Sequence, residues 1–134
     1  MKFEQSFKKF VCAGDTLSFK SNGVLYRAEI VFDDFHNIDD DDSHNVDQTV
    51  TGCDDDQQKL LLDARKAWFN DEWFYCGVRV SAISDGYTLQ SDSLWGIEAN
   101  YPGGDNSYLT EVANDLLGEV MPKVDKLQSA IERV

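Results

Sequence analysis

The sequence predicts an α+β fold, an antiparallel sheet (two hairpins plus a meander strand) with helices packed on one face. Three observations predict it. Two segments alternate apolar and polar residues around the turn dipeptides Asn22-Gly23 and Asp85-Gly86, and a long stretch after residue 105 repeats apolar residues at helical spacing. With 134 residues, of which 42% are hydrophobic, the chain is large enough for a single domain with its own core.

The N-terminal segment predicts a short amphipathic helix that ends near Ala13-Gly14, and a strand is the alternative. Its apolar residues recur at helical spacing, and glycine is a common helix stop. These apolar residues are Phe3, Phe7, Phe10 and Val11.

Residues 16–32 predict a β-hairpin. Asn22-Gly23 favours a two-residue type I′ turn, since both central residues of that turn take positive φ. The turn sets the register and leaves one apolar and one mostly polar face. The predicted pairs are Ser21 with Val24, Phe19 with Tyr26, and Leu17 with Ala28.

The acidity of the chain is concentrated in residues 33–56, which contain ten aspartates, both histidines, and no Lys or Arg. The whole chain has 25 acidic and 12 basic residues, a net charge of −13, and the chain without this stretch has a net charge of −3. So many like charges with few apolar residues predict a mobile acidic loop over about residues 33–52.

A helix is predicted over about residues 56–69, with the preceding aspartates complementing its dipole. The apolar side comprises Leu60, Leu61, Ala64, Ala67 and Trp68.

A second hairpin is predicted to begin at Trp73, with Asp85-Gly86 as another type I′ turn. This register places Ser84 opposite Tyr87 and Ala82 opposite Leu89. Residues 91–93 then predict a turn into a third strand over residues 94–99. In that strand, the side chains of Trp95, Ile97 and Ala99 are expected to lie on the same face.

The C-terminal stretch predicts a long amphipathic helix capped by Asn106 or Ser107. Pro122 interrupts the pattern, and its ring clashes with the carbonyl of Gly118 in a regular helix. The sequence therefore predicts a kink there, or two consecutive helices that share one apolar face, from Leu109 to Ile131.

The acidic stretch is first weighed as a metal site. A weak site is conceivable on His36, Asp40, Asp42 and His44, but the spacing lacks the glycine and glutamate of a calcium-binding EF-hand loop. Zinc favours His or Cys pairs at short spacing, and only single residues are present here. A solvated charged loop is the favoured interpretation, and no cofactor is predicted.

Neither an enzyme nor a nucleic-acid-binding protein is predicted. No catalytic motif is present, and the histidines lie in the predicted mobile loop, a poor place for a general base. The odd number of cysteines, three, favours reduced thiols and a cytoplasmic protein. A sequence pI near 4.3 disfavours contacts with phosphates and anionic membranes, and no apolar run approaches the ~20 residues of a membrane span. The N-terminus is not expected to be a signal peptide.

Aromatic residues are dense around residues 68–75. Trp68 and Trp95 are predicted core residues. Trp73 and Tyr75 point away from the predicted core face, so either a helix or a partner is expected to cover them.

Three segments resemble small acidic accessory proteins encoded by bacterial plasmids and phages. They are NDEWFYCGV (residues 70–78), LWGIEAN (residues 94–100) and DNSYLTEVANDLL (residues 105–117), and the likeness spans roughly residues 1–32 and 70–120. That group has no settled activity, so no site residues carry over, and the acidic insert here is longer and richer in aspartate. The resemblance implies a bacterial host cell, where such proteins inhibit defence machinery as anti-CRISPR or anti-restriction proteins.

The leading hypothesis is a non-enzymatic protein that binds a basic, nucleic-acid-binding host protein through an acidic surface resembling a phosphate backbone. The candidate residues are Asp39, Asp40, Asp41, Asp42, Asp54, Asp55 and Asp56. One alternative is a divalent-cation-binding protein that uses the Asp/His loop. Another is an interaction module with an aromatic surface around Trp73 and Tyr75. The bland alternative is that the charge only maintains solubility.

Overall fold

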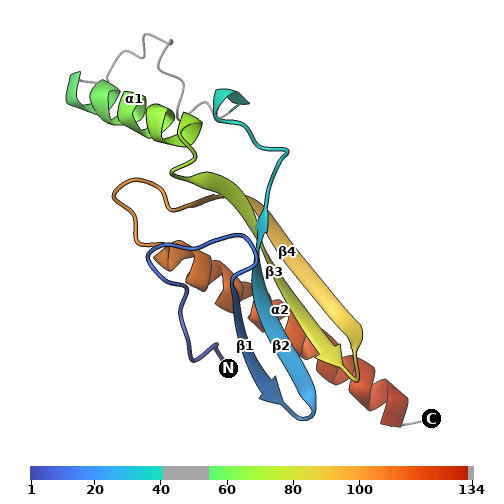
Figure 1. The fold of residues 1–134 in the computed structure, drawn as a ribbon. Helices are drawn as coiled ribbons and strands as arrows, with labels where there is room; N and C mark the ends of the chain where they lie inside the picture. Colours follow the sequence, from blue (N-terminus) through green and yellow to red (C-terminus); the bar gives the residue numbers. More distant parts are fainter. Residues whose placement is uncertain (41–54, 133–134) are drawn as a thin grey trace.

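The structure is a computed structural model that describes residues 1–40 and 55–132. Within these ranges, four strands form one antiparallel sheet in the order β1-β2-β3-β4, and two helices accompany it (Figure 1). The α+β prediction is confirmed. The elements are β1 (Thr16–Ser21), β2 (Val24–Phe32), the 3-10 turn η1 (Ile38–Asp40), α1 (Asp55–Phe69), β3 (Phe74–Ser84), β4 (Tyr87–Ala99) and α2 (Ser107–Glu132).

One face of the sheet is covered and the other is open. Helix α2 packs along β3 and β4, and the N-terminal segment covers the β1 side of the same face, where the ring of Phe3 meets the ring of Phe19 edge-on at 5.4 Å. The main core lies between these layers. Helix α1 lies beyond one end of the sheet (Figure 1) and rests on a separate small cluster formed by Ile38, Ala67, Trp73 and Tyr75.

The first hairpin matches its prediction. Asn22 and Gly23 have φ angles of 51° and 78°, as a type I′ turn requires. The register has Ser21 opposite Val24, and the further predicted pairs are also present. Turn chemistry and side-chain alternation agree here, so the local sequence is sufficient to define the pairing.

The second hairpin departs from its prediction after the first pairs. Ser84 does pair with Tyr87, but Ala82 pairs with Gln90 because a β-bulge leaves Leu89 as an extra residue. The predicted turn at residues 91–93 is wrong, since β4 continues through it as one strand. Pairing with β3 keeps this polar stretch extended, and the hydroxyls of Ser81 and Ser91 lie 3.3 Å apart.

A second bulge reverses the orientation of Trp95. Cys76 pairs with Ile97 and Val78 with Leu94, so Trp95 and Gly96 together oppose the single residue Gly77. The extra residue moves Trp95 to the open face, while Ile97 remains buried. The prediction that Trp95 is a core residue on the same face as Ile97 and Ala99 is therefore wrong. Its ring lies against Gly77, where a Cβ would come within 2.4 Å of Trp95 Cε3.

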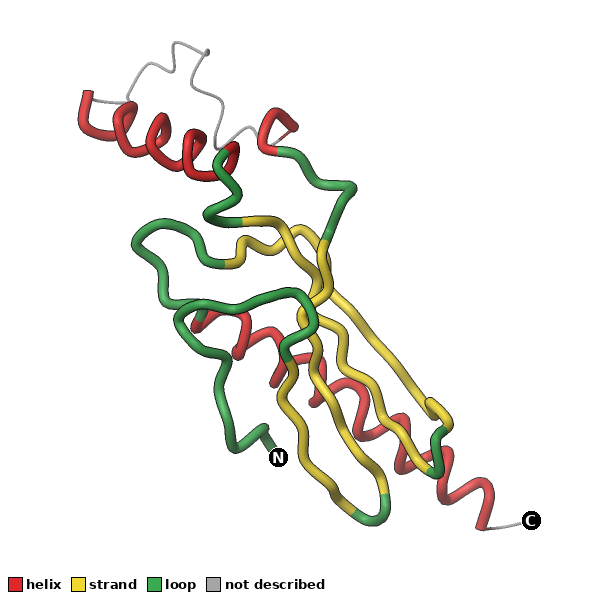
Figure 2. The backbone as a smooth tube through the Cα atoms, in the orientation of Figure 1, coloured by secondary structure: helices red, strands yellow, loops and turns green. Residues whose placement is uncertain are grey.

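The N-terminal segment contains no helix, which corrects the sequence prediction. The segment is an extended loop beside α2 (Figure 2). Phe3, Phe7 and Val11 are buried at a spacing of four residues, whereas Phe10 is exposed. An extended chain covers about twice as much length per residue as a helix, so a few residues reach from Asn114 in α2 to Asn100 after β4.

Side chains from the C-terminal half explain why the segment stays extended. The backbone N–H groups of Phe3 and Phe7 donate to Asn114 Oδ1 at 2.9 Å and to Thr110 Oγ1 at 3.0 Å. The Asn100 side chain accepts from Val11 N at 2.8 Å and donates to Val11 O at 2.9 Å. These bonds satisfy backbone groups that a helix would otherwise pair internally.

Helix α2 is continuous from Ser107 to Glu132 and includes Pro122, so the two-helix alternative is wrong. The kink stays a prediction. Its apolar stripe is buried as far as Val124, whereas Leu127 and Ile131 are exposed.

The first part of the acidic stretch is packed into the fold, contrary to the prediction of a mobile loop from residue 33. Asp33 is buried and its N–H donates to Tyr75 O at 3.0 Å. Ile38 in η1 is fully buried beneath α1. The rest of the predicted loop, residues 41–52, lies outside the described residues.

Candidate functional site: an acidic end with an aromatic groove

In the sequence, residues 33–72 have a net charge of −10 out of −13 for the chain. The described residues of this stretch, 33–40 and 55–72, contain nine acidic and three basic side chains, a net charge of −6. The described part of this stretch comprises η1, α1 and the connections to β2 and β3, all beyond the same end of the sheet (Figure 1). We call this region the acidic end.

The predicted partner-binding aspartates are placed as follows. Asp39 is exposed and pairs with Arg65 of α1. Asp40 ends η1, and Asp55 and Asp56 begin α1, as the predicted helix start requires. Asp41, Asp42 and Asp54 lie outside the described residues, as does His44 of the alternative metal set.

Trp73 and Tyr75 are not a surface for a partner. Their exposed fractions are 1% and 4%, because α1 and Ile38 cover them. The indole N–H of Trp73 donates to Ala64 O in α1 at 2.7 Å, and the rings of Trp73 and Tyr75 meet edge-on with their centres 5.1 Å apart. Of the two predicted alternatives, cover by a helix is what the structure shows, and these two side chains do not themselves form an exposed aromatic surface.

Asp33 fixes His36, which corrects the prediction that both histidines lie on mobile chain. The Asp33 carboxylate accepts from the N–H groups of Phe35 at 3.0 Å and His36 at 3.3 Å, and from Gly96 at 3.0 Å. Its Oδ2 also lies 2.7 Å from His36 Nδ1. Burial by itself raises the pKa of Asp33, but these hydrogen bonds outweigh burial and lower the pKa below its ordinary value. The signal in the sequence was the Asp-x-x-His spacing.

A groove of about 350 Å³ lies beside this contact, between residues 32–37 and the C-terminal end of α1. We call it the aromatic groove. Six aromatic side chains line it, together with three carboxylates, Asp33, Asp34 and Asp71, and no Lys or Arg. The aromatic residues are Phe32, Trp68, Phe69, Trp73, Phe74 and Tyr75.

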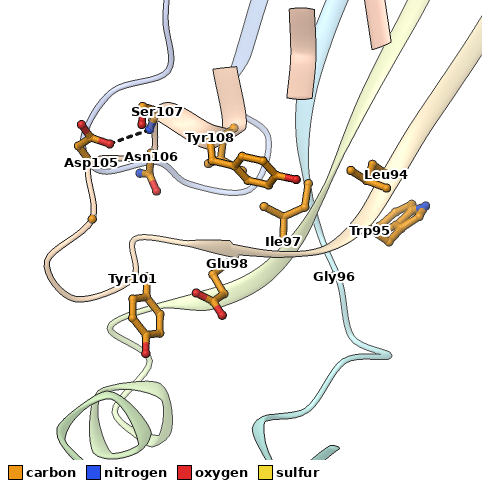
Figure 3. A pocket seen from close by; sticks show the side chains of 12 residues that line it. Leu94, Trp95, Gly96, Ile97, Glu98, Tyr101, Asp105, Asn106, Ser107 and Tyr108 are labelled. Carbon is orange, nitrogen blue, oxygen red and sulfur yellow. Dashed lines mark hydrogen bonds between the residues drawn. The ribbon is translucent and has the colours of Figure 1, made fainter. Parts of the chain in front are cut away.

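A larger hollow of about 660 Å³ lies between β4 and the start of α2 (Figure 3). Its polar groups serve the fold. The Asp105 carboxylate accepts from Ser107 N–H at 2.9 Å, and this bond together with the Ser107 hydroxyl lowers the pKa of Asp105. The predicted cap Asn106 instead donates to Lys9 O at 2.8 Å and to Asn100 Oδ1 at 2.9 Å. The lining contains no His, Cys or Lys, and its Asp105 carboxylate is engaged by Ser107 at the start of α2.

The described part of the chain contains few other reactive groups. Among the described residues, no group of three or more His, Cys, Asp and Glu side chains is placed to hold a metal ion. Burial, and then the negative charge of Asp33, raise the pKa of the Cys76 thiol to about 12, so it is a poor nucleophile. Cys12 is exposed.

Comparison with protein-family models, curated proteins and solved structures gave no match for this chain. Within residues 1–40 and 55–132, no helix combines the length and apolar composition of a membrane span.

Proposed function

We propose that this chain is a non-enzymatic binding protein that inhibits a nucleic-acid-binding protein of a bacterial host. The observation that supports the proposal is the charge distribution: residues 33–40 and 55–72, which lie at one end of the molecule, contain nine acidic and three basic side chains, a net charge of −6. A concentrated field of one sign attracts a surface of the opposite sign and accelerates encounter.

The chemistry of the acidic end supports nucleic-acid mimicry. Duplex DNA carries one negative charge per ~1.7 Å of its axis, and its binding proteins match this with Lys and Arg side chains. Closely spaced aspartates present a comparable row of anionic oxygens to the same side chains. The proposed contact residues are Asp39, Asp40, Asp41, Asp42, Asp54, Asp55 and Asp56.

The resemblance to accessory proteins of plasmids and phages supplies the setting for this proposal. An inhibitor carried by a mobile element acts in the host cytoplasm, where defence proteins handle DNA or RNA. An acidic surface that occupies the groove of such a protein would exclude its nucleic acid.

The test is a pull-down from nuclease-treated bacterial lysate with the natural chain and a variant in which four charges are removed. The variant carries Asp39, Asp40, Asp41 and Asp42 as Asn. We expect the natural chain to retain a nucleic-acid-binding protein that the variant loses, because the attraction depends on the carboxylates. Retention should also weaken as ionic strength rises.

A matched control removes four exposed charges from α2, far from the acidic end in the sequence. Its substitutions are Glu111→Gln, Asp115→Asn, Glu119→Gln and Asp125→Asn. We expect this variant to retain the partner. Equal loss in both variants would show that total charge decides binding, and retention by both would contradict a role for the acidic end.

A further inference from the structure

We propose that the aromatic groove is a binding site for one cationic side chain, an arginine or lysine that projects from the partner. The inference rests on the proposed function, because it assumes that a basic surface approaches the acidic end. It adds a specific anchor point to a contact that is otherwise defined only by charge. The groove provides three features that a cation requires.

The first feature is a set of ring faces. Trp68 and Phe74 line the groove and are half-buried, and they provide the rings there; Trp73 and Tyr75 also line it but are almost fully buried and offer little open ring surface. Phe69 at the C-terminal end of α1 is 58% exposed, but its ring already has the guanidinium of Arg65 over it, so the open rings are mainly those of Trp68 and Phe74. The face of an aromatic ring carries partial negative charge and attracts an ammonium or guanidinium group within ~6 Å of its centre.

The second feature is the charge of the lining. Asp34 and Asp71 are exposed carboxylates in the groove, and Asp33 behind them is held ionised by its four hydrogen bonds. No Lys or Arg in the lining neutralises them. An apolar ligand would desolvate these carboxylates without pairing them, whereas a cation satisfies them.

The third feature is the end of α1. The helix ends at Phe69, beside the groove, and the C-terminal end of a helix carries partial negative charge from its last carbonyl groups. Asp71 follows with a φ of 59°, and its N–H donates to Trp68 O at 3.1 Å. The helix end therefore adds to the attraction of the carboxylates.

The chain already shows this chemistry once within the acidic end. The guanidinium of Arg65 lies 5.3 Å from the centre of the Phe69 ring and pairs with the Asp39 carboxylate. An aromatic ring and a carboxylate thus hold an arginine side chain on α1. The groove offers the same two groups to a side chain from outside, with more rings around it.

The size of the groove is compatible with a single side chain. Its volume of about 350 Å³ is near the lower end of small-molecule sites, ~300–1,000 Å³. One arginine or lysine side chain with its methylene stem suits this space, since the stem packs on the rings and the charged head reaches the carboxylates.

The test uses N-acetyl-arginine amide as the probe and N-acetyl-citrulline amide as its uncharged isostere, each titrated into the full chain and followed by NMR. We expect arginine to shift the indole N–H signal of Trp68 and to leave that of Trp95, on the open sheet face, unchanged. We expect its Kd to be at least about threefold tighter than that of citrulline, the lower range of a cation–π contact. Equal binding of both probes, or shifts confined to residues outside the groove, would overturn the proposal.

Two variants and a control locate the site. Asp71→Asn keeps a residue that tolerates positive φ and removes one charge, and Trp68→Leu removes a ring. Each is expected to weaken arginine binding by roughly threefold to thirtyfold. Trp95→Leu, which removes an aromatic ring outside the groove, is expected to leave the Kd unchanged. Unchanged arginine binding in both Asp71→Asn and Trp68→Leu would overturn the assignment.

The two proposals fail in distinguishable ways. In one outcome, the natural chain captures a basic partner that the variant with Asn at residues 39–42 loses, while the arginine probe does not bind in the aromatic groove. In that case the proposed function stands and the proposed cation site is wrong. If arginine binds in the groove but no basic partner is captured, the site stands without the function.

Discussion

Replacing Asn100 by glycine should remove one of the attachments between the N-terminal segment and the C-terminal half and destabilise the fold substantially. The Asn100 side chain makes three hydrogen bonds: it accepts from Val11 N at 2.8 Å and from Asn106 Nδ2 at 2.9 Å, and it donates to Val11 O at 2.9 Å. A hydrogen bond contributes ~1 kcal/mol net, and more when its partner is left buried and unpaired. We therefore expect a loss of about 2–4 kcal/mol in the free energy of unfolding.

The matched control is Asn22→Gly. Asn22 has a φ of 51° and Asn100 a φ of 62°, so glycine fits both backbones without strain. Asn22 is exposed in its turn, and its side chain makes no hydrogen bond within the described chain. The change in unfolded-chain entropy is therefore common to both variants, and only Asn100→Gly removes contacts.

The assay is urea unfolding. With a slope of about 2 kcal/mol per molar urea, the expected loss lowers the midpoint for Asn100→Gly by about 1–2 M relative to Asn22→Gly. If the two variants unfold within about 0.5 kcal/mol of each other, these side-chain bonds do not hold the N-terminal segment, and the explanation for its extended conformation is refuted.

Three further predictions concern stability. Gly96→Ala should lower the free energy of unfolding, measured in urea, by at least about 1 kcal/mol more than Gly86→Ala. Both glycines have positive φ, but a Cβ on Gly96 would lie 2.7 Å from His36 Nε2, whereas one on Gly86 would meet nothing within 4 Å. Below about pH 4, the melting temperature of the natural chain should fall more steeply than that of Asp33→Asn. The pKa of Asp33 is lowered in the folded state, so its carboxylate stabilises the fold above the unfolded-state pKa, and this stability is lost as the pH falls through the folded-state pKa. Parallel curves for the two proteins would contradict this. Gly118→Ala should raise the free energy of unfolding by about 1 kcal/mol, since Gly118 is an exposed helical position with open space around it, and a loss of stability would show that the helix needs glycine there.

Local chemistry predicted those parts of the fold in which the turn and the alternation of side chains agree. Asn22-Gly23 and Asp85-Gly86 both form their turns, and the pairs beside each turn are correct. The prediction failed where a single residue changes the register. The bulge at Gly96 turns Trp95 to the opposite face, and alternation alone contains no signal for an extra residue.

Long-range contacts explain why the predicted N-terminal helix is absent. The spacing of Phe3, Phe7 and Val11 fits a helix equally well, and only the acceptors at Asn100, Thr110 and Asn114 favour an extended chain. Those partners lie about a hundred positions away in the sequence. Tertiary contacts of this kind override local propensity.

The candidate site was predictable in one respect and not in another. The sequence alone shows the concentration of aspartates, because charge can be counted without a structure. The aromatic groove is assembled from residues 32–37 and 68–75, and its form depends on the packing of α1 over Trp73. Burial of Asp33 also has no signal in composition, since aspartates so close together are usually solvated.

The most direct test of the central claim is whether the chain displaces nucleic acid from its partner. Labelled DNA is bound to the host protein captured in the pull-down, and the natural chain is titrated in while fluorescence anisotropy reports the bound DNA. The account predicts release of the DNA by the natural chain, weaker release at higher salt, and no release by the variant with Asn at residues 39–42. DNA that stays bound while the natural chain saturates the partner would contradict the account.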